Sequence, residues 1–458
     1  MVMRIFGASS AVATLFVCAA CGSSSLELLS PGGDGGAATT PDGGTLAGGG
    51  REAYCSGSGS PILTAGDGGA SACVGGLAQE TFRWALCSCE GLVSATALTT
   101  DSFDSTQGPY DAGSAHPGGA VGTNGHLNAQ GTLGVGGALW ISDSSGMTVA
   151  SASTRGDLYV GGPVSSGPSL SVSGDAYVLG DVTANGNLSV AGTLHQPAGA
   201  SVSAQGTKSL GGTATGSFSV LPPCDCDPAL LVDVASYVEA YRADNDDSAV
   251  GIDPGALANV TTETTLAVPC GRIFFSSVGG TAAITLTLSA GRTAIFVGGD
   301  LSSNGAFSID APPSSEVDLF VEGGVVTASS FTLGSTDNPS KARLWVGGTA
   351  SVNLQNATLL AGNVYAPHST LVLGQSPATV FGSVFVDQVS TQGSLTIHFD
   401  ESVLSAGSAC EPATGTCSSC HDCGNQACVA GVCGACTASS DCCAPLVCNG
   451  GTCVDVIP

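Results

Sequence analysis

Hydrophobic and polar residues alternate between Gly156 and Gln196 with a period of two that is nested in a period of six. Glycine opens six of the seven groups and Pro168 opens the other, while hydrophobic residues such as Leu158 and Val160 favour the third and fifth positions. The alternation is typical of short strands, and glycine suits the bends between them. Because three such faces would close a coil of about eighteen residues, the pattern predicts a β-solenoid with a continuous hydrophobic interior.

A second, looser repeat occupies residues 259–409, where a similar short motif occurs at 295–299 and at 344–348. One aromatic residue falls in each coil-length interval of this section. Aromatic rings at equivalent places in successive coils would stack on one another. We therefore expect an aromatic ladder formed by Phe296, Phe320, Trp345, Tyr365 and Phe385.

The predicted fold class is all-β, a β-solenoid expected to be a right-handed β-helix, in two sections that flank a short helical insert. Shifts in composition and turn-rich stretches set the boundaries. The expected parts are a signal peptide at 1–21, a flexible Gly/Ser/Pro tether at 22–50, a Cys-containing N-terminal cap at 51–115, a first solenoid section at 116–221, the helical insert at 222–258, a second solenoid section at 259–409 and a small Cys-rich module at 410–458.

The helix of the insert is expected to begin with Asp227 as its N-cap and Pro228 in its first position, where each residue type is favoured. Val234, Val238 and Tyr241 follow at spacings of three and four residues. These spacings place the three side chains on one face, so the insert is predicted to carry an amphipathic helix.

The N-terminus has the features of an export signal. Arg4 precedes an apolar stretch at 5–17 that is too short to span a bilayer as a helix. The sequence at 18–21 resembles a bacterial lipobox, whose final cysteine, here Cys21, is lipidated and becomes the new N-terminus. Gly22 follows, which by the same resemblance favours the outer membrane or cell surface of a Gram-negative bacterium. An ordinary cleaved signal peptide is the alternative.

Charge narrows the range of partners. The chain carries 36 acidic and 10 basic residues, which gives a formal net charge of −26. Nucleic acids require a basic surface, and anionic membranes attract basic segments. We therefore expect no nucleic-acid partner, and we expect contact with a membrane only through the N-terminal lipid.

Twenty cysteines are too many for a reducing compartment unless they bind metal. Cys18 would leave with the signal peptide and Cys21 would carry the lipid. The remaining eighteen are disulfide candidates: Cys55, Cys73, Cys87, Cys89, Cys224, Cys226, Cys270, Cys410, Cys417, Cys420, Cys423, Cys428, Cys433, Cys436, Cys442, Cys443, Cys448 and Cys453.

Seven of these cysteines fall in the body and eleven in the tail, so full pairing requires a bridge between the two parts. We expect Cys270 to pair with Cys410 for this reason. The proximity of Cys55 and Cys73 suggests a second bridge, and the C-x-C motif at 87–89 is expected to pair with that at 224–226. A zinc site at 417–423, where Cys and His are dense, is the alternative for the tail.

Asp244, Asp246 and Asp247 cluster after the predicted helix, and carboxylate oxygens suit calcium. The segment lacks the glycine and the final glutamate of an EF-hand loop. A solvated helix end explains the cluster equally well. We expect no cofactor, with calcium at these three residues as the alternative.

Two pairs of polar residues offer candidate chemistry. Glu316 and Asp318 alternate onto one strand face, as do His398 and Asp400, and paired carboxylates can cleave glycans. Alternating polar residues are also what the outward face of any solenoid carries. Phosphate loops, HExxH motifs and nucleophile elbows do not occur in the sequence. We expect no enzymatic activity, with a polysaccharide lyase or hydrolase as the alternative.

Trp140, Tyr159 and Tyr177 lie in the first solenoid section, and the two tyrosines stand at equivalent places in successive coils. By alternation they are expected to point outward. Such rings would either offer a strip on which sugars stack or pack against the strands, and packing is the favoured interpretation.

Two family resemblances follow from these motifs. The hexads at 156–196, with their Gly-Asp-Leu and Gly-Asp-Val openings, are similar to bactofilins, which are polymer-forming β-solenoid proteins. A second resemblance is to an uncharacterised family of large bacterial surface lipoproteins with a β-solenoid and a Cys-rich tail. It is carried by the motifs at 87–89, 223–226, 269–272, 362–367 and 398–400. It implies location and build, and no activity.

Together these observations predict an exported, lipid-anchored envelope protein with a structural or adhesive role. A rigid solenoid on a tether would present repeated side chains to a polysaccharide or a surface protein. Self-association through solenoid ends is a further expectation from the bactofilin resemblance, and the helical and Cys-rich segments are expected to act as caps against it.

Overall fold

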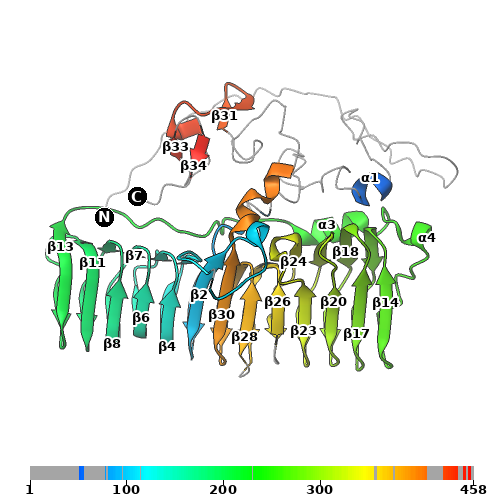
Figure 1. Cartoon of the computed structure of the whole chain (residues 1–458), viewed down its shortest axis with the longest axis horizontal. Coiled ribbons are helices and arrows are strands. Elements are labelled where there is room, and N and C mark those ends of the chain that lie inside the picture. Colours follow the sequence, from blue (N-terminus) through cyan, green and yellow to red (C-terminus); the bar gives the residue numbers. More distant parts are fainter. Residues whose placement is uncertain are drawn as a thin grey trace, which may run out of the picture. The chain divides into compact units, whose positions relative to one another are not determined.

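The computed structural model describes residues 51–55, 78, 81–94, 96–113, 115–228, 231–354, 358–374, 377–409, 427–441, 447–449 and 452–454. Within these ranges the chain forms one 30-stranded sheet of parallel strands wound into stacked coils, so the predicted all-β solenoid is confirmed (Figure 1). The signal peptide, the tether and the predicted lipid site Cys21 lie outside the described residues. So do the disulfide candidates Cys73, Cys410, Cys417, Cys420, Cys423, Cys442 and Cys443.

Short strands rich in Val, Leu, Thr and Ser build the part of the solenoid that comes first in the chain. They are β1 (Leu86–Ser94), β2 (Leu98–Phe103), β3 (Val121–Thr123), β4 (His126–Val135), β5 (Leu139–Ile141), β6 (Met147–Thr154), β7 (Leu158–Val160), β8 (Val164–Val172), β9 (Ala176–Val178), β10 (Val182–Ala184), β11 (Asn187–Gln196), β12 (Val202–Ala204) and β13 (Lys208–Thr215).

The later strands repeat the pattern with larger side chains. They are β14 (Thr264–Val268), β15 (Gly271–Phe275), β16 (Val278–Gly280), β17 (Ile284–Leu288), β18 (Gly291–Val297), β19 (Leu301–Ser303), β20 (Phe307–Asp310), β21 (Ser315–Val321), β22 (Val325–Thr327), β23 (Phe331–Gly334), β24 (Ala342–Val346), β25 (Val352–Leu354), β26 (Thr358–Ala361), β27 (Asn363–Leu373), β28 (Ala378–Phe381), β29 (Val384–Thr391) and β30 (Leu395–Asp400).

In the described residues, helices are few and short. The α-helices are α1 (Arg51–Cys55), α3 (Val234–Tyr241) and α4 (Asp247–Val250), and the 3-10 helices are η1 (Ser105–Gln107), η2 (Pro339–Lys341), η3 (Glu401–Ala409) and η5 (Ser439–Asp441).

The order of the coils in space differs from their order in the chain. The coil made of β1 and β2 pairs on one side with β3 and β4, and on its other side with β29 and β30. The first strands therefore lie in the middle of the solenoid. From there the chain winds to the β13 end, returns to the opposite end and winds back until its last coil docks on its first. The predicted N-terminal cap at 51–115 is wrong in this respect, because its strands form an internal coil.

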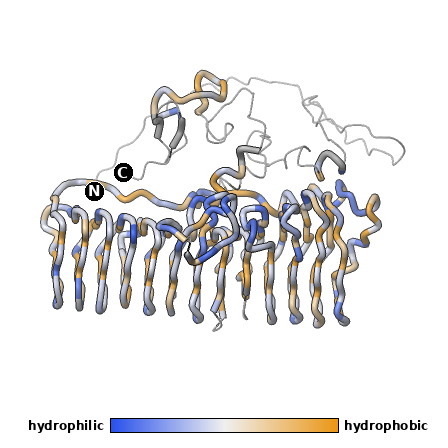
Figure 2. The backbone as a smooth tube through the Cα atoms, viewed as in Figure 1, coloured by the Kyte–Doolittle hydropathy of each residue, from blue (hydrophilic) through white to orange (hydrophobic). Residues whose placement is uncertain are grey.

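Hydrophobic side chains fill the interior of every coil. The alternation seen in the sequence appears along each coil as alternating hydrophobic and hydrophilic positions (Figure 2). At the junction of the first and last coils, which we call the seam, Leu92 of β1 lies between Val389 and Leu127. All three side chains are buried, so the interior continues without a break across the seam.

Residues 216–243, here called the strap, connect the β13 end of the solenoid with its β14 end (Figure 1). The strap contains helix α3, which begins later than the sequence predicted. Asp233, and not Asp227, is the N-cap, and its carboxylate accepts a hydrogen bond from the backbone N–H of Ser236 at 3.0 Å. Before this point the strap is held by two disulfides, which are described below.

The Cys-rich tail contains two antiparallel hairpins in its described residues. Strand β31 (Ala427–Val429) pairs with β32 (Val432–Gly434), and β33 (Val447–Asn449) pairs with β34 (Thr452–Val454). Ala430 and Gly431 have φ angles of 54° and 80°, as the turn of a two-residue hairpin requires. Cys428, Cys433 and Cys436 are disulfide-bonded.

Truncation of Leu92 to alanine tests the seam. Leu92 is fully buried between both halves of the chain, and loss of a buried leucine side chain costs about 2–5 kcal/mol of unfolding free energy. Val93→Ala is the matched control, because Val93 is 47% exposed and its truncation should change stability by no more than about 0.5 kcal/mol. Chemical unfolding followed by circular dichroism measures both. Equal stabilities for the two variants would contradict a packed seam.

Candidate functional site

A single column of side chains runs along the outward face of the solenoid beneath the strap. Strand register places one residue of each coil from β15 to β11 in it, and the two predicted groups of aromatic residues are parts of this one column. From the β14 end to the β13 end its members are Phe274, Phe296, Phe320, Trp345, Tyr365, Phe385, Cys87, Gly122, Trp140, Tyr159, Tyr177 and His195.

Rings from Phe296 to Phe385 contact one another in sequence, stacked except for the tilted pair Trp345 and Tyr365, so the predicted ladder is confirmed. The Phe296 and Phe320 rings lie 5.2 Å apart between centroids with an interplanar angle of 10°. The Tyr159 and Tyr177 rings lie 4.9 Å apart at 4°, and His195 continues this stack at 4.3 Å from Tyr177. Burial is the largest influence that raises the pKa of Tyr159, and the nearby Asp157 raises it further.

This geometry does not favour the sugar-stacking strip that was considered for Trp140, Tyr159 and Tyr177. The rings point outward as expected, but the two faces of Tyr159 are occupied by Trp140 and Tyr177, whose centroids lie 4.2 Å and 4.9 Å away. Tyr159 is only 3% exposed. A sugar stacks on a free aromatic face, so these rings serve the packing of successive coils.

The strap runs along the column from the β13 end to the β14 end, and its residues contact the members of the column in that order. Near the β13 end, the Phe218 ring meets the Tyr177 ring edge-on at 5.7 Å, and Trp140 Nε1 donates a hydrogen bond to the Leu221 carbonyl at 2.7 Å. Toward the β14 end, the strap contacts are Val232 N–H to Tyr365 Oη at 2.8 Å, the Tyr237 ring on Phe320 at 5.7 Å, and the Tyr241 ring on Phe296 at 4.4 Å.

Two disulfides fix the strap where the aromatic column is interrupted. Cys87 bonds to Cys224 and Cys89 bonds to Cys226, which joins the two C-x-C motifs that the sequence paired. The next position of the column is Gly122. A Cβ atom at Gly122 would lie 3.0 Å from side-chain atoms of Pro223, so glycine gives the strap room to approach here.

A third disulfide corrects two predicted pairings. Cys55 bonds to Cys270, and therefore neither the Cys55–Cys73 bridge nor the Cys270–Cys410 bridge forms. The reason is tertiary, because helix α1 packs against β15 and β18, and Arg51 Nε donates to the Cys270 carbonyl at 2.9 Å. Parity counting cannot detect a contact between residues 215 positions apart.

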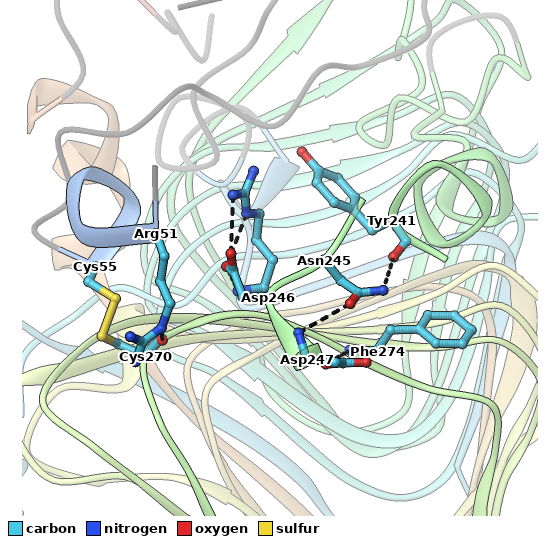
Figure 3. A network of polar contacts seen from close by, with 9 residues as sticks. Arg51, Cys55, Tyr241, Asn245, Asp246, Asp247, Cys270 and Phe274 are labelled. Atoms are coloured by element: carbon cyan, nitrogen blue, oxygen red, sulfur yellow. Dashed lines mark hydrogen bonds and ion pairs between the residues drawn. A yellow bond between two sulfur atoms is a disulfide. The ribbon is translucent and has the colours of Figure 1, made fainter. Parts of the chain in front are cut away.

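The β15 edge at the β14 end of the solenoid is capped by Asp246 and Asp247, which Figure 3 shows beside it, and by backbone that follows them. Asp246 Oδ2 accepts from the Arg272 backbone N–H at 2.8 Å, and Asp247 Oδ1 accepts from the Phe274 backbone N–H at 3.0 Å. Further along, the Pro254 carbonyl accepts from another backbone N–H of this edge, that of Ser276. The carboxylates therefore replace the missing neighbouring strand.

This capping role accounts for two of the three calcium candidates. The Asp246 carboxylate also faces the Arg272 guanidinium, with Oδ2 at 3.3 Å from Nε. Burial raises the pKa of Asp247, against the lowering effect of its bond to Phe274 N–H, and Asp246 raises it further. Among the described residues, no group of three or more His, Cys, Asp or Glu side chains lies close enough together to hold a metal ion.

Glu316 and Asp318, the predicted carboxylate pair, do lie together, but both bind Arg343. Arg343 Nε is 2.6 Å from Asp318 Oδ1, and Nη2 is hydrogen-bonded to both carboxylates. Trp345 Nε1 donates to Asp318 at 3.0 Å. Burial raises the pKa of Glu316, but Arg343 and then Arg292 outweigh it, so the pKa is lowered. A general acid needs the opposite shift.

His398 and Asp400 do not bond to each other. His398 Nδ1 lies 2.6 Å from Asp101 Oδ1 across the seam, and Tyr110 Oη donates to Asp101 Oδ2 at 2.9 Å. Burial, followed by this hydrogen bond, raises the pKa of Tyr110 to about 12. Asp400 is buried and accepts hydrogen bonds from Ser105, including its Oγ at 2.8 Å. Both residues thus hold the last coil against the first.

A serine–histidine pair near the seam resembles part of a hydrolase triad but has the wrong geometry. Ser102 Oγ lies 3.0 Å from His116 Nδ1, and Glu401 Oε1 lies 3.6 Å from the same nitrogen. In a Ser–His–acid triad the serine and the acid contact different ring nitrogens. The cluster is therefore a local polar contact between a strand and a loop.

Arg343, Asp101 and Tyr110 were not singled out from the sequence. Arg343 had one available signal, because the chain has only ten basic residues and this one lies in a hydrophobic strand phrase. For Asp101 and Tyr110 no such signal was available, because their partner His398 lies 297 positions after Asp101 in the chain.

Comparison with known protein families shows a similarity over the second half of the chain. Residues 224–405 are similar to a domain of unknown function, DUF7305. This span begins at Cys224 in the strap and ends within η3, so it includes β14 to β30 but none of β1 to β13. No curated protein and no solved structure shows significant similarity to the chain.

Replacement of Arg343 by alanine tests the buried ion pair. Removal of one partner leaves Asp318, which is fully buried, without its counter-charge, and this costs about 3–5 kcal/mol. The control is Arg242→Ala, which removes an exposed arginine paired with Glu239 and Glu322, and each exposed pair contributes no more than about 1 kcal/mol. Denaturant titration compares the two variants. Similar losses would show that Arg343 is not a structural counter-ion.

Removal of both strap disulfides, by serine at Cys87, Cys89, Cys224 and Cys226, should free the strap near Trp140. Each bridge closes a long segment, 137 residues apart in sequence, and loss of a disulfide typically costs about 2–5 kcal/mol. Hydrogen exchange of the backbone amides of β5 and β7 should accelerate, because the strap that covers these strands is then held less tightly. Serine at Cys55 and Cys270 is the control, since that bridge lies at the β14 end. Unchanged exchange at β5 in the first variant would contradict the clamp.

Proposed function

We propose that this protein is an exported, lipid-anchored component of the cell envelope, in which the solenoid acts as a rigid structural or adhesive rod. One observation carries the proposal. All the parallel strands form a single continuous stack. Three disulfides between residues 137 or more positions apart hold helix α1 at its β14 end and the strap at its central coil. Such a body resists deformation along its whole length.

Location is supported by the disulfides, which are typical of oxidising, extracytoplasmic compartments. None of the helices in the described part of the chain combines the length and the hydrophobicity that a membrane crossing needs. We assign the anchor to a lipid on Cys21, with residues 22–50 as a tether, at the outer membrane or surface of a Gram-negative bacterium.

Adhesion is supported by a second outward column, which the strap does not cover. It consists of hydroxyl side chains in register from one end of the solenoid to the other, interrupted at Leu359 and Gly134. Its hydroxyl members are Thr265, Thr285, Ser308, Thr332, Thr379, Thr396, Thr99, Ser153, Ser171, Ser189 and Ser209. None of these positions is charged, although the chain has a net charge of −26. A neutral, hydroxyl-rich polymer suits this surface.

The alternative, a polysaccharide-active enzyme, has less support. Glu316 and Asp318 share one guanidinium, and His398 is engaged by Asp101. These contacts give the candidate groups structural partners. Release of product in the experiment below would nevertheless favour this alternative.

The test passes the full chain over immobilised neutral cell-wall and extracellular polysaccharides, and it records both retention and newly formed reducing ends. We expect retention without release. A variant with Thr285→Asp and Thr379→Asp should lose retention, because it places two charges in the hydroxyl column. Thr281→Asp, at an exposed turn outside the column, is the matched control. Retention that is equal in the two variants would overturn the adhesive assignment, and absence of retention in the parent chain would leave only a structural role.

A further inference from the structure

The two ends of the solenoid are built differently. At the β14 end, the outermost strand β15 is covered by Asp246, Asp247 and the carbonyl groups that follow them. At the other end, β13 pairs on one side with β11, and within the described residues no strand or loop pairs with its other edge. In the part of the chain that the structure describes, the β14 end is thus closed and the β13 end is open.

The interior of the solenoid is exposed at the open end. Val202, Ala204 and Leu210 occupy the inward positions of the last coil and are only partly buried. Their partners one coil further in, such as Val182 and Val190, are 2% exposed. The hydrophobic column therefore ends against solvent and leaves apolar surface that a further layer would bury.

The edge of β13 also offers unused hydrogen-bonding groups. Leu188 of β11 donates its N–H to the Thr207 carbonyl at 2.8 Å. Because peptide groups alternate in direction along a strand, those of Lys208 and Leu210 face away from β11. Natural proteins usually blunt such an edge with charges, proline or a covering segment.

The distribution of charge indicates that the partner at the β13 end is a second copy of this chain. Lys208 is the single formally charged residue between positions 182 and 224, in a chain whose net charge is −26. Two copies of this chain repel one another over most of their surfaces, but not at this end. In a two-fold pairing of one β13 with another, the strands run antiparallel, so the two copies of Lys208 lie at opposite ends of the contact.

We infer that the β13 end is a dimerisation surface, on which a second copy of this chain adds its own β13 edge to edge. The pairing joins backbone groups of the two strands and buries Val202, Ala204 and Leu210 of both copies. Because the β14 end is capped by Asp246 and Asp247, assembly stops at two copies. The inference is independent of what the outward columns bind.

The test uses the exported full chain with Cys21→Ser, so that a lipid cannot drive association, in sedimentation equilibrium over a range of concentrations. We expect a monomer–dimer equilibrium that tightens as salt rises, since salt screens the repulsion between the acidic bodies. A monomer at every concentration, or a continuing series of larger species, would overturn the inference.

Two variants locate the contact. Thr213→Asp adds a negative charge at an exposed position of β13 and should weaken the dimer at least about tenfold. Lys208→Pro removes an edge donor at the first residue of the strand, where proline is tolerated, and should weaken it as well. Thr183→Asp, at an exposed position of an inner coil, is the matched control and should leave the equilibrium unchanged.

Hydrogen exchange on the same samples separates the alternatives. In the dimer, the β13 amides should be protected, and this protection should disappear on dilution. Protection of β13 that persists in a monomer would assign the open end to another segment of the same chain and would overturn the inference. A dimer that tolerates both Thr213→Asp and Lys208→Pro would place the contact elsewhere and would also overturn it.

Discussion

The contact between the strap and the aromatic column is the constraint on which the rest of the structure depends. The chain completes its first run of coils at β13, and its next strand, β14, belongs at the opposite end of the solenoid. The return path must cross every coil, and it does so over the ring edges that would otherwise be exposed. Phe218, Leu221, Tyr237 and Tyr241 contact rings of the column in the order in which these rings follow one another along the solenoid. Any shift of the strap would break all of these contacts together.

The same route explains why disulfides are placed where they are. The last coil docks on the first, so the central coil has both neighbours only when the whole chain has folded. Contacts between such distant residues form slowly because long loops must close first. The Cys87–Cys224 and Cys89–Cys226 bridges hold the strap at this central coil, and Cys55–Cys270 holds α1 at the β14 end.

Polar side chains of the outward face serve closure at several places. Asp246 and Asp247 take the place of a missing strand, Asp101 and His398 join the first and last coils, and Asp318 compensates the charge of Arg343. Asp246 and Asp247 accept hydrogen bonds from backbone N–H groups of an edge strand, whereas Asp101 and Asp318 bind side chains of a neighbouring coil. The acidic residues that look like catalytic candidates in the sequence are thus largely explained by structural demands.

The sequence by itself determined the coil and its contents. Hydrophobic alternation, glycine at bends and one aromatic per coil are local and periodic signals, because each coil repeats the same contacts with its neighbours. The pairing of the C-x-C motifs was also visible, since two matched spacings leave few arrangements. Only the tertiary structure decided the order of the coils, the Cys55–Cys270 bridge, the later start of helix α3 and the partners of Glu316 and His398. These depend on which distant segments the returning chain brings together, and a repetitive sequence carries no local signal that distinguishes one coil's neighbour from another's.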